Sequence, residues 1–249
     1  MKNKIFVFIF VIIIPFFIYF VDHVVFDDMV IEASYDQSQD WKMIYENQEE
    51  YPLSLIELAL RNKETIPFVS HYPQNKYKTS KMTLERELSF EMVPLLLQWD
   101  ERWGYEKYGK DMMAINGCGP TCLSMVASYL KQDPTLHPYA IAQYAYEHGY
   151  YNDGTSWSLM SEGARYLGLQ VQELPLSEQA IINALKDNQL IICSVREGTF
   201  TTTGHFIVLR GYQDGLIYVN DPNSVIKSQR GYTYNELSHQ IKNLWSYGI

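Results

Sequence analysis

The order of the sequence patterns limits the possible folds of this chain more than any other feature. Segments with helical periodicity come first, at 118–132, 138–148, 156–167 and 176–188. Short runs rich in β-branched and aromatic residues follow, at 190–195, 205–212 and 216–221. Strands that alternate with helices would indicate a parallel sheet, whereas helices followed by neighbouring strands favour separate layers. We therefore predict an α+β fold in which N-terminal helices pack on a C-terminal antiparallel sheet.

The first of these helices begins at an unusual motif. Residues 115–126 read INGCGPTCLSMV. Proline is tolerated only in the first turn of a helix, so Pro120 places the helix start at about Cys118 or Gly119. A thiol at this position lies beside unpaired backbone N–H groups and the positive end of the helix dipole, which stabilise an anion. Gly117 and Gly119 on either side are expected to leave space for backbone to approach a substrate carbonyl.

The last two strand runs form a predicted hairpin that brings together a histidine and an aspartate. The sequence Gln213-Asp214-Gly215 suits a three-residue loop. In that register Tyr212 faces Leu216, and Ile207 faces Asp221. His205 lies two residues from Ile207, on the same face and diagonal to Asp221, within reach of polar side chains. A slip of one residue would separate the two groups.

These three residue types suit nucleophilic catalysis by a thiol. The helix start and a neighbouring imidazolium lower the pKa of a cysteine, and a carboxylate holds the imidazole in the required tautomer. The backbone N–H of Cys118 is a donor for an oxyanion. We interpret Cys122, one turn along the helix, and Cys193, inside the run LIICSV, as packing residues. Three cysteines, an odd number, do not form a disulfide framework.

The N-terminal segment has a different composition. No charged residue occurs from Ile5 to Val21, and a run of about 17 residues is near the lower limit for a membrane-spanning helix. Lysines precede the run, acidic residues follow it, and no Ala-x-Ala-like cleavage site is present. We predict a signal anchor at 1–23, an acidic stalk with a short helical region at 24–90 and the main domain at 91–249. The body would lie outside the cell membrane, or be secreted if the segment is cleaved.

The net charge of −9 argues against a nucleic-acid partner, because binding to phosphates needs clustered lysine and arginine. Two other functional classes are compatible with the residues. A Cys-x3-Cys pair with a distant histidine suits Cu(I). A groove lined by aromatic side chains would suit a module that binds peptides without turning them over.

Several motifs together resemble one family. The segments LLQWDERWGYEKYG, INGCGPTCLSMV, GHFIVLRGY and NDPNS, within 93–247, are similar to the C39-like cysteine peptidases of the papain-like superfamily. The resemblance implies a papain-like fold and a membrane-anchored or secreted bacterial peptidase that uses neither metal nor organic cofactor. It implies Cys118 as nucleophile, His205 as general base and acid, and Asp221 as the orienting carboxylate. It also implies Gln98 as a side-chain donor to the oxyanion hole.

The family resemblance implies a peptide or protein substrate that forms a thioester with the enzyme. The sequence departs from many papain-like enzymes in one respect, since the long segment from Trp99 to Gly117 separates the glutamine from the cysteine. Three alternatives stay open at this point. They are a catalytically silent papain-like binding module at the cell surface, an acyl transferase that uses the same thiol, and a thiol/His copper-binding protein.

Overall fold

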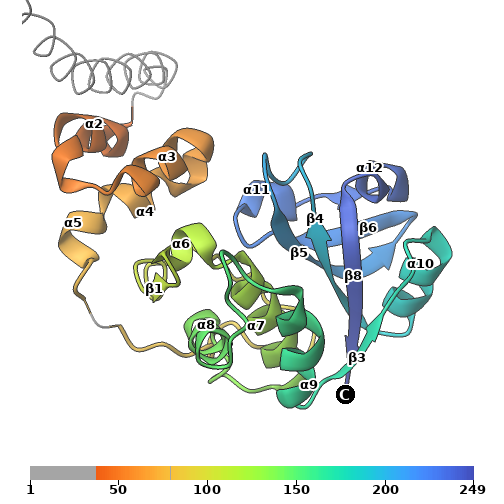
Figure 1. Ribbon diagram of the computed structural model, residues 1–249. Coiled ribbons are helices and arrows are strands. Elements are labelled where there is room, and N and C mark those ends of the chain that lie inside the picture. The colour runs from red at the N-terminus through yellow and green to blue at the C-terminus, as the bar shows by residue number, and fades with distance from the viewer. Residues whose placement is uncertain (1–37, 79) are drawn as a thin grey trace, which may run out of the picture. The chain divides into compact units, whose positions relative to one another are not determined.

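The computed structural model describes residues 38–78 and 80–249, and the protein divides after Ser70 into two compact units (Figure 1). The predicted anchor at 1–23 lies outside the described residues. Among the residues that are described, no helix has the length and apolar character needed to cross a bilayer.

The first unit is helical and has a small core of its own. Its helices are α2 (Gln39–Glu46), α3 (Leu53–Arg61) and α4 (Ile66–Ser70), with 3-10 turns at Gln48–Glu50 and Lys63–Thr65. Nine hydrophobic side chains are buried in it: Trp41, Ile44, Tyr51, Leu55, Ile56, Ala59, Ile66, Phe68 and Val69. Within the predicted acidic stalk, residues 38–70 therefore form a packed helical unit.

The second unit begins at His71. Leu84, which precedes the predicted peptidase domain at 91–249, is fully buried in its main core. The longer helices of this unit are α7 (Cys118–Lys131), α8 (Pro138–Glu147) and α10 (Glu178–Lys186), and a π-helical turn (Leu159–Gly163) leads into α9 (Ala164–Tyr166). Shorter elements are α5 (Tyr72–Asn75), β1 (Lys107–Tyr108), β2 (Asp111–Met112), α6 (Met113–Asn116), α11 (Val225–Ser228) and α12 (Tyr234–Ser238).

An antiparallel sheet of six strands completes this unit, in the order β3-β8-β4-β5-β6-β7. The strands are β3 (Gln170–Glu173), β4 (Leu190–Val195), β5 (His205–Gln213), β6 (Leu216–Asn220), β7 (Gly231–Tyr232) and β8 (Ile241–Gly248). The sequence predicted β4, β5 and β6 but missed the other three. The α+β prediction is confirmed, with an antiparallel sheet that follows the main helices in sequence.

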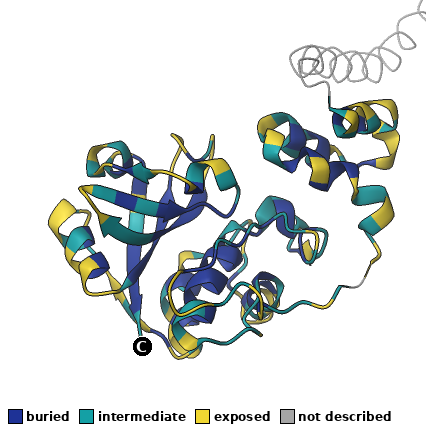
Figure 2. Cartoon of the chain, turned by 180° about the vertical axis from the view of Figure 1, so that it is seen from behind, coloured by how far each residue is buried: buried dark blue, intermediate teal, exposed yellow. Residues whose placement is uncertain are grey.

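Helices cover both faces of the sheet, and alternate residues of β4 and β5 face different cores. Ile192 and Val208 belong to the core around α7, whereas their neighbours Ile191 and Ile207 pack with α10. The strands β4 and β5 are largely dark blue in Figure 2, as expected for strands buried on both faces. The first residue of β5 and the first residue of α7 supply the groups discussed below.

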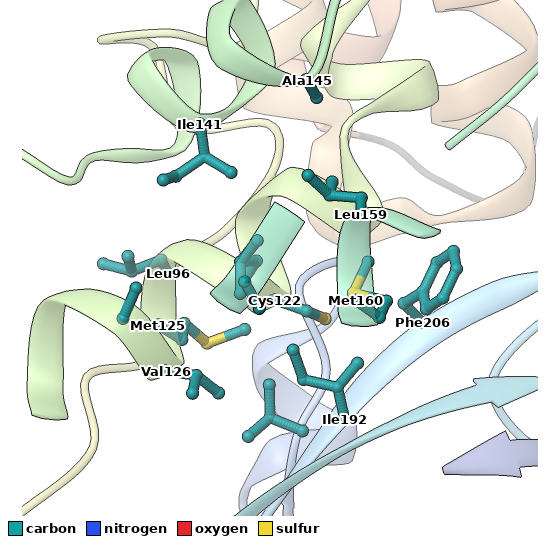
Figure 3. Packing of buried hydrophobic residues seen from close by; sticks show 14 of the residues in the cluster. Leu96, Cys122, Met125, Val126, Ile141, Ala145, Leu159, Met160, Ile192 and Phe206 are labelled. Atoms are coloured by element: carbon teal, nitrogen blue, oxygen red, sulfur yellow. The ribbon is translucent and has the colours of Figure 1, made fainter. Parts of the chain in front are cut away.

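Two of the three cysteines are core residues, as the sequence predicted. Cys122 is fully buried among apolar side chains that include Met160 and Phe206 (Figure 3). Cys193 is fully buried in the core on the α10 side of the sheet. Burial raises the pKa of both thiols, so both remain protonated and unreactive at neutral pH.

Candidate active site

Cys118 is the first residue of α7, and its position follows from the sequence around it. Pro120 lies in the first turn, where its missing N–H costs no helical hydrogen bond, and Gln132 ends the helix in a left-handed conformation (φ 50°). All three cysteines are free, and Cys118 alone of the three is partly exposed. The structure thus places one accessible thiol at the N-terminus of a helix of 14 residues.

The two glycines beside this cysteine serve packing within the protein, which corrects the expectation that they leave space for a substrate. A Cβ atom on Gly117 would lie 2.4 Å from the carbonyl oxygen of Met113. A Cβ atom on Gly119 would lie 2.6 Å from Cγ2 of Thr155. The space that each glycine leaves is therefore filled by the protein's own atoms. These contacts fix the approach of α6 and of the 155 segment to the start of α7.

We expect Gly119→Ala to destabilise the protein by about 1–3 kcal/mol, because the added methyl group overlaps Thr155 in a packed region. Chemical denaturation, followed by tryptophan fluorescence, measures this change. Gly248→Ala is the matched control, since its added Cβ meets no atom within 4 Å. Thr155→Gly in the Gly119→Ala background should restore part of the stability. Equal stability of the two single alanine variants would contradict the packing role.

The hairpin of β5 and β6 has the predicted pairing near the histidine but not near its turn. The turn has two residues, Asp214 and Gly215, both with positive φ, and Gln213 pairs with Leu216. This turn shifts the register of the two strands by one residue from the predicted register. A bulge between Leu209 and Gly211 shifts the register by one residue in the opposite direction, so that Val208 pairs with Asn220 as predicted. Asp221 consequently follows β6 at the position opposite Ile207, as predicted.

His205 and Asp221 are in direct contact. Nε2 of His205 lies 2.7 Å from Oδ1 of Asp221, and both side chains are buried. The backbone N–H of Asn223 donates to the same Oδ1 at 2.8 Å, and the N–H of Asp221 donates to Oγ of Ser228 at 2.8 Å. The carboxylate is thus held by the turn that follows β6. With Nε2 engaged, Nδ1 of His205 is the ring nitrogen left for another partner.

Electrostatics connects this pair to the thiol. Burial opposes the charge on His205, but the Asp221 carboxylate and the side-chain hydrogen bond with Cys118 outweigh it, raising the pKa of His205 to about 10. The imidazole is therefore protonated at neutral pH. The imidazolium thus interacts with the carboxylate of Asp221 and with the side chain of Cys118, which is the order of groups that nucleophilic catalysis by a thiol requires.

Gln98 lies close to this group through the segment just before α7. Its Nε2 donates to the carbonyl oxygen of Ala114 at 2.6 Å, and a second carbonyl, of Ile115, lies at 3.4 Å. Its backbone N–H donates to the carbonyl of Pro222, next to Asp221. The side chain is buried, and its Oε1 has no hydrogen-bond partner among the described residues. The structure thus brings Gln98 to both the cysteine segment and the aspartate turn.

Sequence reasoning missed the residues that hold the aspartate turn. Nε1 of Trp99 donates to the carbonyl of Asn223 at 3.1 Å, and Oγ of Ser228 donates to the carbonyl of Ser224 at 2.7 Å. Trp99 directly follows Gln98 in the motif QWD, which was a usable signal. Ser228 had none, because its role depends on the short helix α11 folding back over Asp221.

The burial of Cys122 bears on the copper alternative. Its side chain points into the core that Figure 3 shows, away from solvent, so the predicted Cys-x3-Cys pair presents one accessible thiol instead of two. Within 38–78 and 80–249, no group of three or more His, Cys, Asp or Glu side chains is arranged to hold a metal ion.

Comparison with known proteins assigns this chain to a family. Residues 90–247 match the model of the Peptidase_C39 like family, which is more than half of the sequence. This chain belongs to the Peptidase_C39 like family. Membership supports a cysteine peptidase function in general terms, and the papain-like prediction fits it. A comparison with curated proteins gives no match.

Solved structures of C39 domains are similar to this chain at low identity. The peptidase domain of Streptococcus ComA, described as a bifunctional ABC transporter of a quorum-sensing pathway, is 19% identical over 53% of this chain and 91% of its own, with a TM-score of 0.43. A C39-like peptidase from Bacillus anthracis is 16% identical over 63% of this chain and 94% of its own, with a TM-score of 0.43. A double-glycine-motif protease from an AMS/PCAT transporter, solved in complex with the leader peptide, is 19% identical over 68% of this chain and 98% of its own, with a TM-score of 0.40.

Proposed function

We propose that this protein is a cysteine peptidase in which Cys118, His205 and Asp221 form the catalytic triad. The observation that supports the proposal best is the position of His205. Its Nε2 contacts Asp221 at 2.7 Å, and its interaction with Cys118 helps to raise its pKa. The thiol starts a helix and is partly exposed, so it is accessible to a substrate.

The proposed mechanism has two steps. The Cys118 thiolate attacks the peptide carbonyl carbon, and His205 gives its proton to the leaving amine as the C–N bond breaks, which leaves a thioester on Cys118. Water, deprotonated by His205, then attacks the thioester carbon and releases the second product together with the thiol. Asp221 keeps the imidazole oriented and stabilises its positive charge in both steps. The chemistry calls for neither a metal nor an organic cofactor.

The oxyanion of each step needs two donors. The N–H of Cys118 is available at the helix start, where the first N–H groups have no helical acceptor. The second donor in the proposal is Nε2 of Gln98, which carries two hydrogens and gives one to Ala114 at 2.6 Å. The other hydrogen bonds only weakly to Ile115 at 3.4 Å, so an oxyanion would replace a poor acceptor.

The proposed substrate is a peptide or protein outside the cytoplasmic membrane. The location rests on the sequence of the predicted anchor at 1–23, with lysines before the apolar run and acidic residues after it. A partly exposed thiol and a buried histidine suit hydrolysis of an amide bond.

The reactivity of the thiols tests the proposal without knowledge of the substrate. We expect iodoacetamide to label Cys118 selectively below pH 8.5, the ordinary pKa of a cysteine, and His205→Ala to abolish this selectivity. Mass spectrometry of peptides from the full-length protein, labelled over a pH series, measures the rate at each cysteine. Cys122 and Cys193 are internal controls, because burial raises the pKa of both. Labelling of Cys118 no faster than the two buried thiols at every pH would reject the triad.

A further inference from the structure

A cavity separate from the proposed triad lies between the 87–95 segment and the β5-β6 hairpin. Its volume is about 360 Å³, within the range of small-molecule and peptide-side-chain pockets, roughly 300–1,000 Å³. The 87–95 segment supplies most of the lining, and its apolar part comes from Met92, Val93, Pro94 and Leu95. Neither Cys118 nor any of the three residues assigned to act with it lines the cavity.

Arg210 is the one cationic side chain that lines this cavity. Its guanidinium lies over the ring of Tyr218, with Cζ 5.4 Å from the ring centroid. Within the described part of the protein, no carboxylate or other acceptor bonds to it. Burial lowers the pKa of Arg210. A guanidinium in this position is a donor without an acceptor.

The fold places Arg210 here through the β-bulge. Leu209 pairs with Val219 and Gly211 pairs with Tyr218, so Arg210 is the extra residue and has no partner in β6. Bulges direct a side chain away from the regular ladder and often occur beside functional sites. Arg210 therefore lies outside the pairing of β5 with β6, and it lines the wall of the cavity.

The other charged residue of the lining does not satisfy Arg210. Oε1 of Glu87 is paired with Arg102 at 2.8 Å, and its buried Oε2 has no hydrogen-bond partner among the described residues, so neither oxygen bonds to Arg210. The remaining polar groups are also engaged, since Nδ2 of Asn220 donates to Pro94 at 3.0 Å. Arg210 is thus the group of the lining that is left to pair with an entering anion.

Exposed apolar side chains occur in the segment that supplies most of the lining. Met92 lines the cavity and is 69% exposed, and Phe90, two residues earlier in the sequence, is 83% exposed. Large apolar side chains at this level of exposure, together with an unpaired arginine, are typical of protein surfaces that bind a peptide. Arginine forms two parallel hydrogen bonds with a carboxylate, which fixes the ligand's orientation as well as its charge.

We propose that this cavity binds a carboxylate carried next to an apolar side chain of a peptide, with Arg210 as the anchor and Met92 and its neighbours as the apolar wall. The carboxylate is that of a peptide's free C-terminus or of an aspartate or glutamate side chain. Asn220, in the lining, directly precedes Asp221 in the sequence, so the cavity and the triad share the end of β6. The site does not depend on peptidase chemistry and can be tested in a protein without the thiol.

Calorimetric titration of the full-length protein with Cys118→Ala, purified in a mild detergent, tests the site with defined probes. N-acetyl-Leu-Leu with a free carboxylate should bind about tenfold more tightly than its C-terminal amide. Arg210→Gln should remove this difference, and Arg210→Lys, which keeps the charge but not the paired geometry, should keep part of it. N-acetyl-Leu-Asp-amide distinguishes the source. If this peptide binds as tightly as the free acid, the site accepts the carboxylate of an acidic side chain. If this peptide does not bind, the site requires the carboxylate of a free C-terminus.

Arg230→Gln is the matched control. Arg230 also lies over a tyrosine ring, 3.8 Å from the centroid of Tyr232, but it is paired with Glu236 at 3.0 Å. Its substitution should leave the titration unchanged. The proposal is overturned if free acid and amide bind equally, if Arg210→Gln binds the acid as well as the parent does, or if no probe binds at up to about 10 mM. The comparison of acid and amide needs no substitution at Arg210, so it holds even if that variant folds poorly.

Discussion

Cys118→Ala is expected to lower kcat/KM for peptide hydrolysis by about 10,000-fold or more, because the variant has no nucleophile to form the thioester. The side chain is partly exposed at a helix start, so its loss leaves the core intact. We therefore expect the free energy of unfolding to change by about 0.5 kcal/mol or less. Cleavage of a quenched fluorescent peptide library measures the activity, and urea denaturation measures the stability.

Cys122→Ala is the control that separates loss of chemistry from loss of structure. Cys122 is fully buried in the core around α7, so its truncation should destabilise the protein by about 1 kcal/mol. Its thiol has no role in the proposed reaction, so the variant should keep kcat/KM at temperatures where it is folded. Hydrolysis by Cys118→Ala at the wild-type rate would show that another group is the nucleophile.

The prediction that His205 lies near Asp221 is right because the hairpin differs from the predicted one in two places, and the two differences shift the strand register in opposite directions. The predicted three-residue loop is a two-residue turn, in which Asp214 and Gly215 both adopt positive φ. That difference alone would place Asp221 on the wrong face. The bulge at Arg210 restores the register before it reaches the histidine. The sequence holds a signal for the turn, since Asp-Gly favours a two-residue hairpin, but none for the bulge.

The missed strands have a different cause. β8 lies between β3 and β4 in the sheet, and both of its partners precede it in the sequence by more than 40 residues. Four consecutive residues of β8, Leu244 to Tyr247, are buried because the strand is covered on both faces, so it lacks the alternation of a half-exposed strand. β3 is mostly polar and exposed at the edge of the sheet. Neither strand has a local pattern that distinguishes it from loop.

The start of α7 was predictable to within one residue, whereas its surroundings were not. Pro120 and the helix rules place the start at Cys118 or Gly119 from local sequence alone, and the helix begins at Cys118. The glycines were assigned to substrate access because their neighbours in space, Met113 and Thr155, cannot be known from spacing. The sequence thus indicates which residues have the required chemistry, and tertiary packing decides which of them meet.

Substitution of Asp221 separates orientation from charge in the proposed triad. Asp221→Ala removes the acceptor that lies 2.7 Å from Nε2 of His205 and leaves the N–H of Asn223 without its partner. We expect kcat/KM to fall by roughly 1,000- to 10,000-fold, since the imidazole loses its tautomer and its direction. Asp221→Asn keeps an oxygen that accepts hydrogen bonds from Nε2 of His205 and from the N–H of Asn223, so this variant should keep most of the activity at neutral pH.

The two variants should differ from the wild type in the pH dependence of kcat/KM. The Asp221 carboxylate helps to hold the pKa of His205 at about 10 against the effect of burial. A neutral asparagine removes that attraction, so the imidazolium loses its proton at a lower pH. The thiolate and imidazolium pair exists only below the pKa of His205, and the alkaline limb of the Asp221→Asn profile should therefore move toward neutral pH.

Asp153→Asn is the matched control for loss of a carboxylate. Asp153 is exposed and paired with Lys110 at 2.6 Å, and that contact lowers its pKa. The change of charge is the same, but the group does not contact His205, so the pH profile should coincide with that of the wild type. An alkaline limb that stays in place in Asp221→Asn would show that Asp221 does not maintain the charge on His205. Full activity of Asp221→Ala would remove the aspartate from the triad and leave a dyad of Cys118 and His205.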